Sequence, residues 1–255
     1  MKTDLTDVTF LLYIRPDSII RIENLIMSIS FIKENFNTNI KVVESASYDN
    51  KIIKTILNKD VEHSYLEDKD PVFHRTKYFN FLTEKVRTPY IGLWDADTII
   101  DQRQVMEAIK LLRENQADVT LPYNGSALDT STPIRSLFWE KRNIDIFHNN
   151  SDKMSLVYGT NLNGGAVLIN LEKYKRAGKE CLDYYGWGRE DDDRFTRYEK
   201  LGYRIFKVDG YLYHLSHPRD ENGWFMNQEQ FRKSTDILNR RRKSTTREIL
   251  TSLSV

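Results

Sequence analysis

Cysteine is nearly absent from the sequence. The chain has 255 residues and one cysteine, Cys181, so an internal disulfide bond is excluded and a reducing setting is expected. The sequence also lacks an apolar run long enough to cross a bilayer, and residues 1–7 are polar, unlike a signal peptide. We therefore expect a cytoplasmic protein, for which any membrane contact is peripheral and at the inner face of the membrane.

The net charge of the chain is also close to zero. The 38 lysines and arginines almost balance the 37 aspartates and glutamates, which leaves a formal net charge of +1. Such a balance provides no overall field for a polyanion, so nucleic acid is not expected as a partner. One short basic run, residues 240–243, is interpreted as a solvated helix face, with contact to an acidic membrane surface as the alternative.

The first half of the chain alternates short apolar runs with amphipathic segments. Alternation of this kind is typical of βαβ units and predicts an α/β fold, with a mostly parallel central sheet flanked by helices. The predicted strands are 8–14, 40–44, 61–66, 90–94 and 118–121, and the predicted helices are 19–29, 49–57, 74–86 and 102–115.

The alternation breaks at residues 122–160, which are rich in Asn, Gly, Ser, Thr and Pro and contain one predicted helix, 134–147. We interpret this segment as an insertion or a mobile flap. No linker separates it from the rest, so residues 1–255 are predicted to form a single domain. The later predicted elements are strands 164–170 and 203–208, helices 171–177 and 192–201, and a C-terminal helical extension from residue 226 onward.

Four consecutive carboxylates follow a Gly-Trp-Gly-Arg sequence at residues 186–189. Neighbouring like charges repel one another, but a helix N-terminus stabilises them. The segment is therefore predicted to be a loop that runs into a helix. Taken alone, it could equally be the acidic first turn of a solvated helix.

Two further patterns suggest a metal site. Asp95 and Asp97 follow the predicted strand 90–94, and His214 and His217 follow another apolar segment. Carboxylate oxygens suit Mg²⁺ and Mn²⁺, and a mixed set of oxygen and imidazole ligands suits Mn²⁺. The alternatives are a strand that ends in polar turn residues and a buried, stacked pair of histidines.

Charged residues also gather near the predicted strand ends. Ligands of parallel α/β sheets bind at the carboxyl ends of the strands, where Arg15, Glu44 and Asp95 are expected to lie. Arg15, Arg75 and Lys77 could hold a diphosphate, with plain surface charge as the alternative for each.

In chain order, these motifs resemble the β-1,4-galactosyltransferases and bacterial relatives that include the chondroitin-polymerase type. The resemblance rests on Asp95-Ala96-Asp97, Gly164-Gly165-Ala166, residues 186–193 and His214-x-x-His217, and it is spread over about residues 8–220. It implies the GT-A nucleotide-sugar transferase fold. Two departures are Arg189, where the family often has glycine, and residues 122–160, which match no familiar pattern.

The resemblance also implies roles on the nucleotide side. Asp97, His217 and His214 correspond to the ligands of a Mn²⁺ or Mg²⁺ cofactor, and Asp95 corresponds to a contact with the ribose. The remaining residues assigned to nucleotide binding are Arg15, Glu44, Arg75 and Lys77.

On the acceptor side, the resemblance implies that Asp191 is the catalytic base and that Glu190 binds acceptor hydroxyls. Trp187, Gly164 and Gly165 are assigned to the donor and acceptor sugars. Asp192 and Asp193 are expected to cap the following helix or to pair with Arg194 or Arg197. Residues 1–121 would then be the nucleotide-sugar half, 122–225 the acceptor and metal half, and 226–255 the helical extension.

The predicted function is a metal-dependent, inverting glycosyltransferase that uses a UDP-sugar, with galactose or N-acetylgalactosamine favoured. Its acceptor is predicted to be a saccharide, free or glycolipid-linked. Two alternatives come from other classes: a nucleotidyltransferase or metal-dependent hydrolase, and a non-catalytic sugar-binding module.

Overall fold

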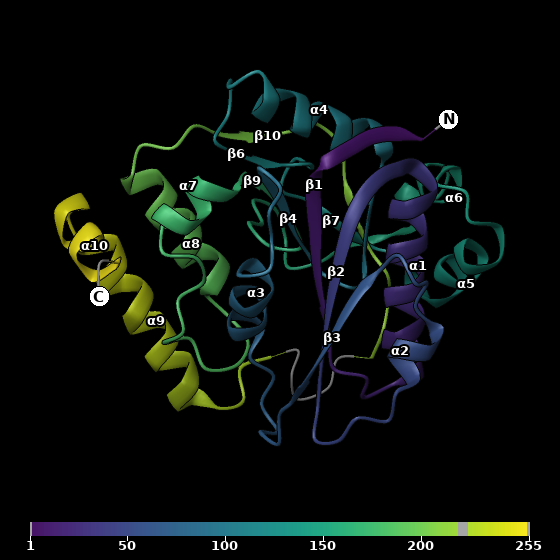
Figure 1. Ribbon diagram of the computed structural model, residues 1–255, viewed down its shortest axis with the longest axis horizontal. Coiled ribbons are helices and arrows are strands. Elements are labelled where there is room, and N and C mark those ends of the chain that lie inside the picture. The colour runs from purple at the N-terminus through teal and green to yellow at the C-terminus, as the bar shows by residue number, and fades with distance from the viewer. Residues whose placement is uncertain (1, 219–223, 254–255) are drawn as a thin grey trace.

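The computed structural model describes residues 2–218 and 224–253. Its main sheet has seven strands in the order β10-β6-β9-β4-β1-β2-β3 (Figure 1). Only β9 runs antiparallel to its neighbours within this sheet, so the prediction of a mostly parallel sheet is confirmed. The strands are β1 (Thr3–Ile14), β2 (Phe36–Ala46), β3 (Glu62–Glu67), β4 (Tyr90–Trp94), β6 (Val119–Leu121), β9 (Ala166–Asn170) and β10 (Ile205–Lys207).

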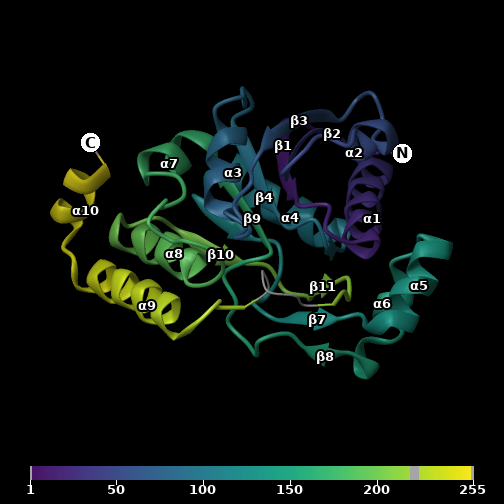
Figure 2. The ribbon, with the colours of Figure 1, turned by 90° about the horizontal axis from the view of Figure 1, so that it is seen from below.

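Helices cover both faces of the main sheet. Helices α1 and α4 lie on one face, while α3 and α7 lie on the other, with α8 and α9 beside them (Figure 2). No helix in the described part of the chain is both long and apolar enough to span a membrane. The helices are α1 (Ile19–Asn35), α2 (Ile52–Ile56), α3 (Arg75–Thr83), α4 (Gln102–Arg113), α7 (Leu171–Arg176), α8 (Glu190–Lys200), α9 (Gln228–Lys243) and α10 (Thr246–Leu253).

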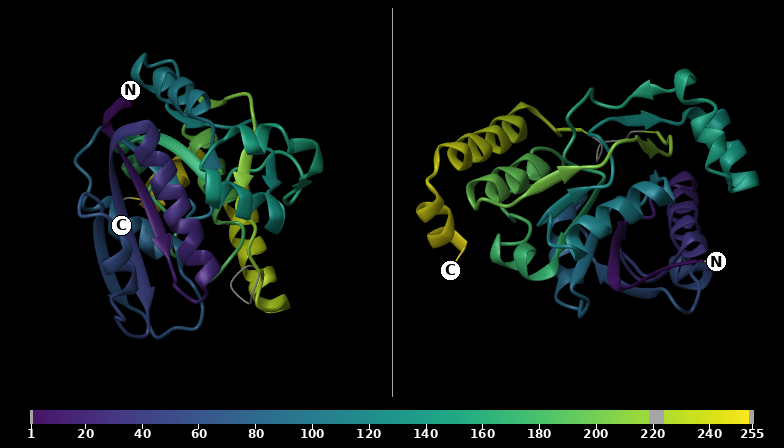
Figure 3. Two further views of the ribbon diagram at one scale, coloured as in Figure 1. Left: turned by 90° about the vertical axis from the view of Figure 1, so that its right-hand side faces the viewer. Right: turned by 90° about the horizontal axis from the view of Figure 1, so that it is seen from above.

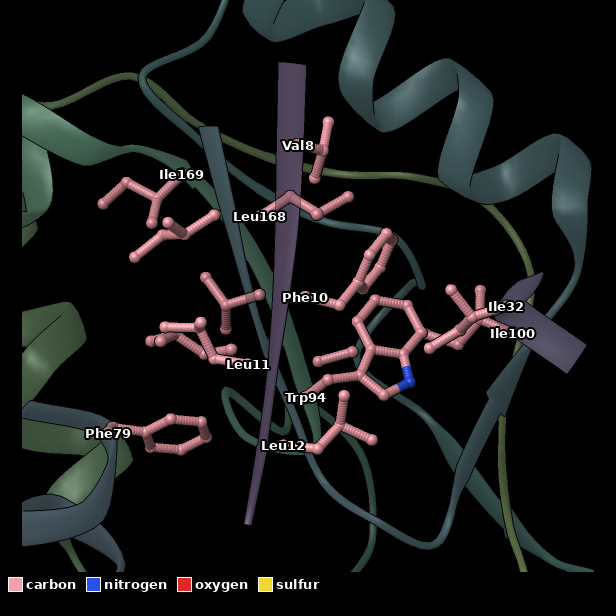
Figure 4. Packing of buried hydrophobic residues seen from close by; sticks show 14 of the residues in the cluster. Val8, Phe10, Leu11, Leu12, Ile32, Phe79, Trp94, Ile100, Leu168 and Ile169 are labelled. Atoms are coloured by element: carbon pink, nitrogen blue, oxygen red, sulfur yellow. The ribbon is translucent and has the colours of Figure 1, made fainter. Parts of the chain in front are cut away.

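The core is organised around β1, whose side chains alternate between the two faces. Leu11 points toward Phe79 of α3, whereas Phe10 points toward Trp94 and Ile32 on the opposite side (Figure 4). All five side chains are at most 2% exposed. Since β1 is buried on both faces, its sequence is a nearly continuous apolar run rather than an alternating one.

A second sheet of four strands, in the order β5-β11-β7-β8, lies beside the first (Figure 2). It carries the part of the chain that was interpreted as an insertion or mobile flap. Figure 3 shows the helices that follow β7 gathered at the end of this sheet. The elements are β5 (Thr98–Ile100), β7 (Ala127–Asp129), α5 (Ser131–Lys141), α6 (Asp145–His148), the 3-10 helix η1 (Ser151–Lys153), β8 (Ser155–Leu156) and β11 (Leu212–His214).

Residues 122–160 pack against the rest of the chain through a second apolar cluster. Phe138 of α5 and Phe147 of α6 are fully buried and contact Phe31 and Tyr213, respectively. The single helix predicted at 134–147 is two helices, because Arg142 adopts a left-handed backbone conformation with φ of 54°. This break turns the chain so that both phenylalanines face the same cluster, and the flap interpretation is corrected accordingly.

Candidate active site

The carboxyl edge of the main sheet brings distant motifs together. Arg15 follows β1 and Asp95 follows β4, and these strands are parallel neighbours. Because β9 runs the other way, its beginning lies at the same edge, where Trp94 pairs with Ala166 and the Asp95 N–H donates to the Gly165 carbonyl at 2.8 Å. The glycine pair that precedes β9 therefore lies directly beside the first aspartate of Asp95-Ala96-Asp97.

Pairing between β5 and β11 joins the second aspartate to the histidines. Thr98 pairs with His214, and the Leu215 N–H donates to the Asp97 carbonyl at 2.7 Å. The Asp97 carboxylate oxygen Oδ2 lies 3.1 Å from His217 Nε2 and 3.7 Å from His214 Nε2. The three possible ligand atoms all lie within 4.8 Å of one another, and this is the one such group among the described residues.

The outer nitrogens of both histidines have partners of their own. His217 Nδ1 lies 2.8 Å from the Pro218 carbonyl, and His214 Nδ1 lies 3.5 Å from an Asp129 carboxylate oxygen. A proton on each Nδ1, bonded to the Pro218 carbonyl in His217 and facing Asp129 in His214, would leave each Nε2 free to act as a ligand, which is the usual arrangement around histidine-bound metals. Burial would raise the pKa of Asp97, but His214 and then His217 hold it well below its usual range. This donor set fits Mn²⁺ or a similar divalent cation.

Arg75, the first residue of α3, links the two sides of the site. Its guanidinium donates to both oxygens of Asp191 at 2.8 Å, to Asp95 at 3.0 Å and to Glu190 at 3.4 Å. It also lies within 6 Å of two aromatic ring centroids, Tyr13 and Phe79. Only 11% of its side chain is exposed. A nearly buried guanidinium with three carboxylate partners is held firmly, because breaking the group would leave charges unpaired in a low dielectric.

Asp191 lies in the first turn of α8 and is held by two arginines. Arg194, one turn further on, donates to Asp191 at 2.5 Å and to both oxygens of Glu180 at 2.9 Å. Burial would raise the pKa of Asp191, but Arg75 and Arg194 outweigh burial and hold it below its usual value. The carboxylate is therefore ionised at neutral pH. A Cβ at Gly164 would come within 2.2 Å of Asp191 Oδ2, so this close approach requires glycine.

Glu190, the next residue toward the N-terminus, has the opposite character. It is only 5% exposed, and burial together with the nearby Asp191 charge raises its pKa to about 7. One of its oxygens accepts a hydrogen bond from the Gly188 N–H at 2.8 Å. Neighbouring carboxylates of one helical turn are thus in different protonation environments, which is common where acid–base chemistry occurs.

Two adjoining cavities open at this edge. The first, about 170 Å³, is bounded by Arg15, Phe73, Asp97 and the two histidines. The second, about 600 Å³, is bounded by residues around Gly164 and Asp191 and by several aromatic side chains. Together they form one cleft with a metal-ligating side and a carboxylate side. The residues that line both cavities are Tyr13, Arg75, Asp95, Asp97, Tyr158, Trp187, Glu190 and His214.

Comparison with solved structures finds the same fold in three glycosyltransferases. The catalytic domain of Drosophila β1,4-galactosyltransferase 7 with xylobiose has a TM-score of 0.54 and 13% identity, over 95% of this chain and 82% of that one. A Pyrobaculum calidifontis mannosyltransferase with GDP-Man and Mn²⁺ has a TM-score of 0.56 and 14% identity, over 92% of this chain and 64% of that one. The glucosyl-3-phosphoglycerate synthase of Mycobacterium tuberculosis, with Mn²⁺, UDP and phosphoglyceric acid, has a TM-score of 0.55 and 14% identity. The match covers 91% of this chain and 78% of that one.

Sequence comparison adds a family match over the site itself. Residues 146–218, which include the acidic stretch and both histidines, match the family described as the N-terminal domain of galactosyltransferase. The chain has the GT-A glycosyltransferase fold. No match was found among curated protein sequences.

Two residues predicted to bind the nucleotide lie outside both cavities, so their expected place at the rim of the site is corrected. Glu44 is buried within β2, where His63 Nε2 lies 2.9 Å from its carboxylate. Lys77 points to solvent from α3 and pairs with Asp68 at 3.0 Å. Sequence position alone misplaced them, because Glu44 precedes the end of its strand and Lys77 lies on the far side of α3 from Arg75. The other residues predicted for the site all line at least one cavity.

Four polar residues of the site were not predicted. Tyr13 donates to Asp95 at 2.8 Å, and Asp129 contacts His214 from the neighbouring strand β7. Arg194 could have been found from its i, i+3 spacing to Asp191 on a helix, whereas Glu180 stands in a loop with no recognisable pattern. Asp193 pairs with Arg197 as predicted, at 2.9 Å.

Proposed function

We propose that the protein is a metal-dependent, inverting glycosyltransferase that moves a sugar from a UDP-sugar to a saccharide hydroxyl. The observation that carries this proposal is the pairing of an Asp97–His214–His217 cluster with an ionised, partly buried Asp191 across one cleft. A metal site and a separate carboxylate are the two parts that such a transfer needs. A sugar-binding module would need only the aromatic walls.

On the metal side, Asp97, His214 and His217 would hold Mn²⁺ or Mg²⁺. Such an ion, when bound, neutralises the negative charge that develops on a diphosphate leaving group. Arg15 extends this side of the cleft, with its guanidinium bonded to the Pro71 carbonyl at 2.7 Å and 5.5 Å from the Phe73 ring centroid. A cation and an aromatic ring at this place suit a nucleotide diphosphate.

On the carboxylate side, Asp191 takes the proton from the acceptor hydroxyl as that oxygen attacks the anomeric carbon. The bond from the anomeric carbon to the diphosphate breaks, and the bond to the acceptor oxygen forms on the opposite face of the sugar. A single displacement therefore inverts the configuration, so that an α-linked donor gives a β-linked product. Arg194, itself fixed by Glu180, keeps the base oriented, and Glu190 binds acceptor hydroxyls.

For the donor sugar, we propose galactose or N-acetylgalactosamine. This choice rests on the sequence resemblance and on the galactosyltransferase family match at residues 146–218. Among proteins of similar fold, one structure contains UDP and two contain Mn²⁺. Gly164, Gly165 and Trp187 would line the donor and acceptor sugars, since all three border the second cavity.

We also propose that the acceptor is a free or glycolipid-linked saccharide and that the protein acts in the cytoplasm, with peripheral contact to the inner face of the membrane. Arg240, Arg242 and Lys243 are exposed at the end of α9, and basic side chains of this kind bind anionic lipid surfaces. Co-sedimentation with phosphatidylserine vesicles tests the contact. Binding that does not weaken with added salt would contradict it.

Thermal denaturation with UDP-sugars tests the donor side. A ligand that binds only the folded protein raises its melting temperature. UDP-galactose or UDP-N-acetylgalactosamine should raise it together with Mn²⁺, and much less with the metal chelated by EDTA. The absence of a shift with every UDP-sugar would count decisively against the proposal.

Replacement of Asp191 tests the base. Asp191→Asn should lower the transfer rate by about 100-fold or more, which is the usual contribution of a general base. Binding of the UDP-sugar, measured by thermal shift, should persist because the metal ligands are untouched. Asp152→Asn, at an exposed position outside the cleft, is the control. A variant that retains most of its turnover would show that Asp191 is not the base.

A further inference from the structure

The helix α9 contacts the acceptor side of the cleft, although it lies beyond the matched segment 146–218 and was predicted to belong to an appended extension. It runs beside α8, which carries Glu190 and Asp191 (Figure 2). Arg241 of α9 donates to the buried Asp193 of α8 at 2.9 Å. The two helices are therefore joined at a position two residues beyond the proposed base.

The N-terminal turn of α9 makes the more informative contact. Asn227 caps the helix by accepting from the Gln230 backbone N–H at 2.9 Å. The Gln230 side chain then turns toward the loop that precedes α8. Its Nε2 donates to the Tyr185 carbonyl at 2.7 Å and to the Trp187 carbonyl at 3.0 Å, and its Oε1 accepts from the Met226 N–H at 2.6 Å. Both N–H groups and the oxygen of this amide are therefore used.

The loop is also packed tightly from two sides. Gly186, between the two bonded carbonyls, has a φ of 81°, and a Cβ there would lie 3.0 Å from both Gln230 Nε2 and a Val72 methyl group. The loop is thus held between α9 and the segment that leads into α3. Gln230 is 8% exposed, and its hydrogen bonds are protected from competing water. Since Trp187 lines both cavities, what fixes this loop also fixes a wall of the cleft.

We propose that Gln230 is a positioning residue for acceptor binding, which makes α9 part of the acceptor site. It acts through the main chain of residues 185–187 and sets the place of the Trp187 ring and of the Gly188 N–H that binds Glu190. This inference rests on the proposed function, in which Trp187 and Glu190 contact the acceptor sugar.

Two isosteric substitutions on one helix turn test the proposal. Gln230→Met keeps the length of the side chain but removes both donors, and Gln228→Met makes the same change at an exposed position. Transfer is assayed with the UDP-sugar that stabilises the wild type and with p-nitrophenyl β-xyloside, β-galactoside and β-N-acetylglucosaminide as acceptors. Gln230→Met should raise the acceptor KM by about tenfold, because the three hydrogen bonds that it loses no longer hold the Trp187 wall of the acceptor site in place. The kcat and the donor KM should change less than threefold, and Gln228→Met should match the wild type.

Amide hydrogen exchange supplies a readout that needs no substrate. Exchange at residues 185–188 should be faster in Gln230→Met than in the wild type, with β9 unchanged. Equal exchange in the two proteins would overturn the proposal, as would faster exchange with an unchanged acceptor KM. If the wild type transfers to none of the three acceptors with any UDP-sugar, the proposed function fails instead, and the exchange measurement still decides whether Gln230 positions the loop.

Discussion

Glu190 and Asp191 show how two adjacent carboxyl groups acquire different properties. Asp191 faces two guanidiniums and has a lowered pKa, whereas burial raises the pKa of Glu190 to about 7. The difference arises because Arg75 lies 2.8 Å from Asp191 but 3.4 Å from Glu190, and because Arg194 bonds only to Asp191 of the two. A single helical turn can thus supply one group that is always charged and one that titrates near neutrality.

Glu190 should make folding stability depend on pH. Its folded-state pKa of about 7 lies above the ordinary value of 4.5. The contribution of Glu190 to the free energy of unfolding is therefore fully present below about pH 4.5 and is lost as the pH rises through 7. Between pH 5 and 8, wild type should lose roughly 2 kcal/mol of unfolding free energy relative to Glu190→Gln, whose amide does not titrate. Urea denaturation of both proteins across this pH range measures the loss of unfolding free energy. Parallel pH profiles for the two proteins would refute the assignment.

At the scale of elements, Asp118 joins three pieces of secondary structure. It precedes β6, accepts from the Arg204 N–H at 2.8 Å and from its guanidinium at 3.0 Å just before β10, and pairs with Lys173 of α7 at 3.4 Å. The hydrogen bonds from Arg204, opposed by burial, lower the pKa of Asp118 from 3.8 to about 2. Edge strand β10 has only three residues, so this junction helps to hold it on the sheet.

The substitution Asp118→Asn should therefore destabilise the fold by about 1 to 2 kcal/mol at pH 7. Because the folded-state pKa is lowered, this contribution is present above about pH 4 and fades as the pH falls through 2. Urea denaturation at pH 7, 5 and 3 should show a constant difference from wild type at the first two values and a smaller one at the third. Asp152→Asn, on the exposed 3-10 helix, is expected to match wild type throughout.

The sequence was most informative where an apolar run ends in polar residues. Asp95 and Asp97 could be placed at a sheet edge because β4 is continuously apolar and stops at Trp94. The convergence of Asp97 with His214 was predicted from the ligand types and the family resemblance, but the pairing of the three-residue strands β5 and β11 that produces it was not. Strands this short have no usable periodicity.

Side chains that act through a partner were equally hard to predict. Arg75 was expected on the nucleotide side only, yet it reaches Asp191, because α3 begins between the two cavities. Glu180 has no helical spacing to Arg194 and lies in a loop. The left-handed residue Arg142 is not a glycine or an asparagine, so nothing in its type indicated the break between α5 and α6.

At the scale of the whole molecule, the second apolar cluster supports the metal side of the cleft. Tyr213 and Leu215, the neighbours of His214 in sequence, both belong to it. So do Phe138 of α5 and Met27 of α1, which come from widely separated parts of the chain. Residues 122–160 thus brace the strand that carries one of the proposed ligands.

Truncation within this cluster should weaken both folding and metal binding. Phe138→Ala is expected to cost about 3 to 5 kcal/mol of unfolding free energy, because it removes a fully buried ring. Mn²⁺ affinity, measured by calorimetry, should fall as His214 becomes less well held. Leu137→Ala, the adjacent residue with 42% exposure, should change either quantity little. Normal Mn²⁺ affinity in a folded Phe138→Ala protein would show that the apolar cluster does not support the metal site.

The guanidinium of Arg75 bonds to Asp95 on one side of the cleft and to Asp191 on the other. In the proposed reaction it would therefore act as a shared counter-ion for the donor site and the acceptor site. A donor diphosphate that draws Arg75 away from Asp191 makes that carboxylate a stronger base. Equilibrium linkage then requires the reverse: an acceptor that prefers the released carboxylate must tighten donor binding by the same factor. In the proposed reaction, cooperativity between donor binding and acceptor binding would thus follow from one side chain, without any movement of domains.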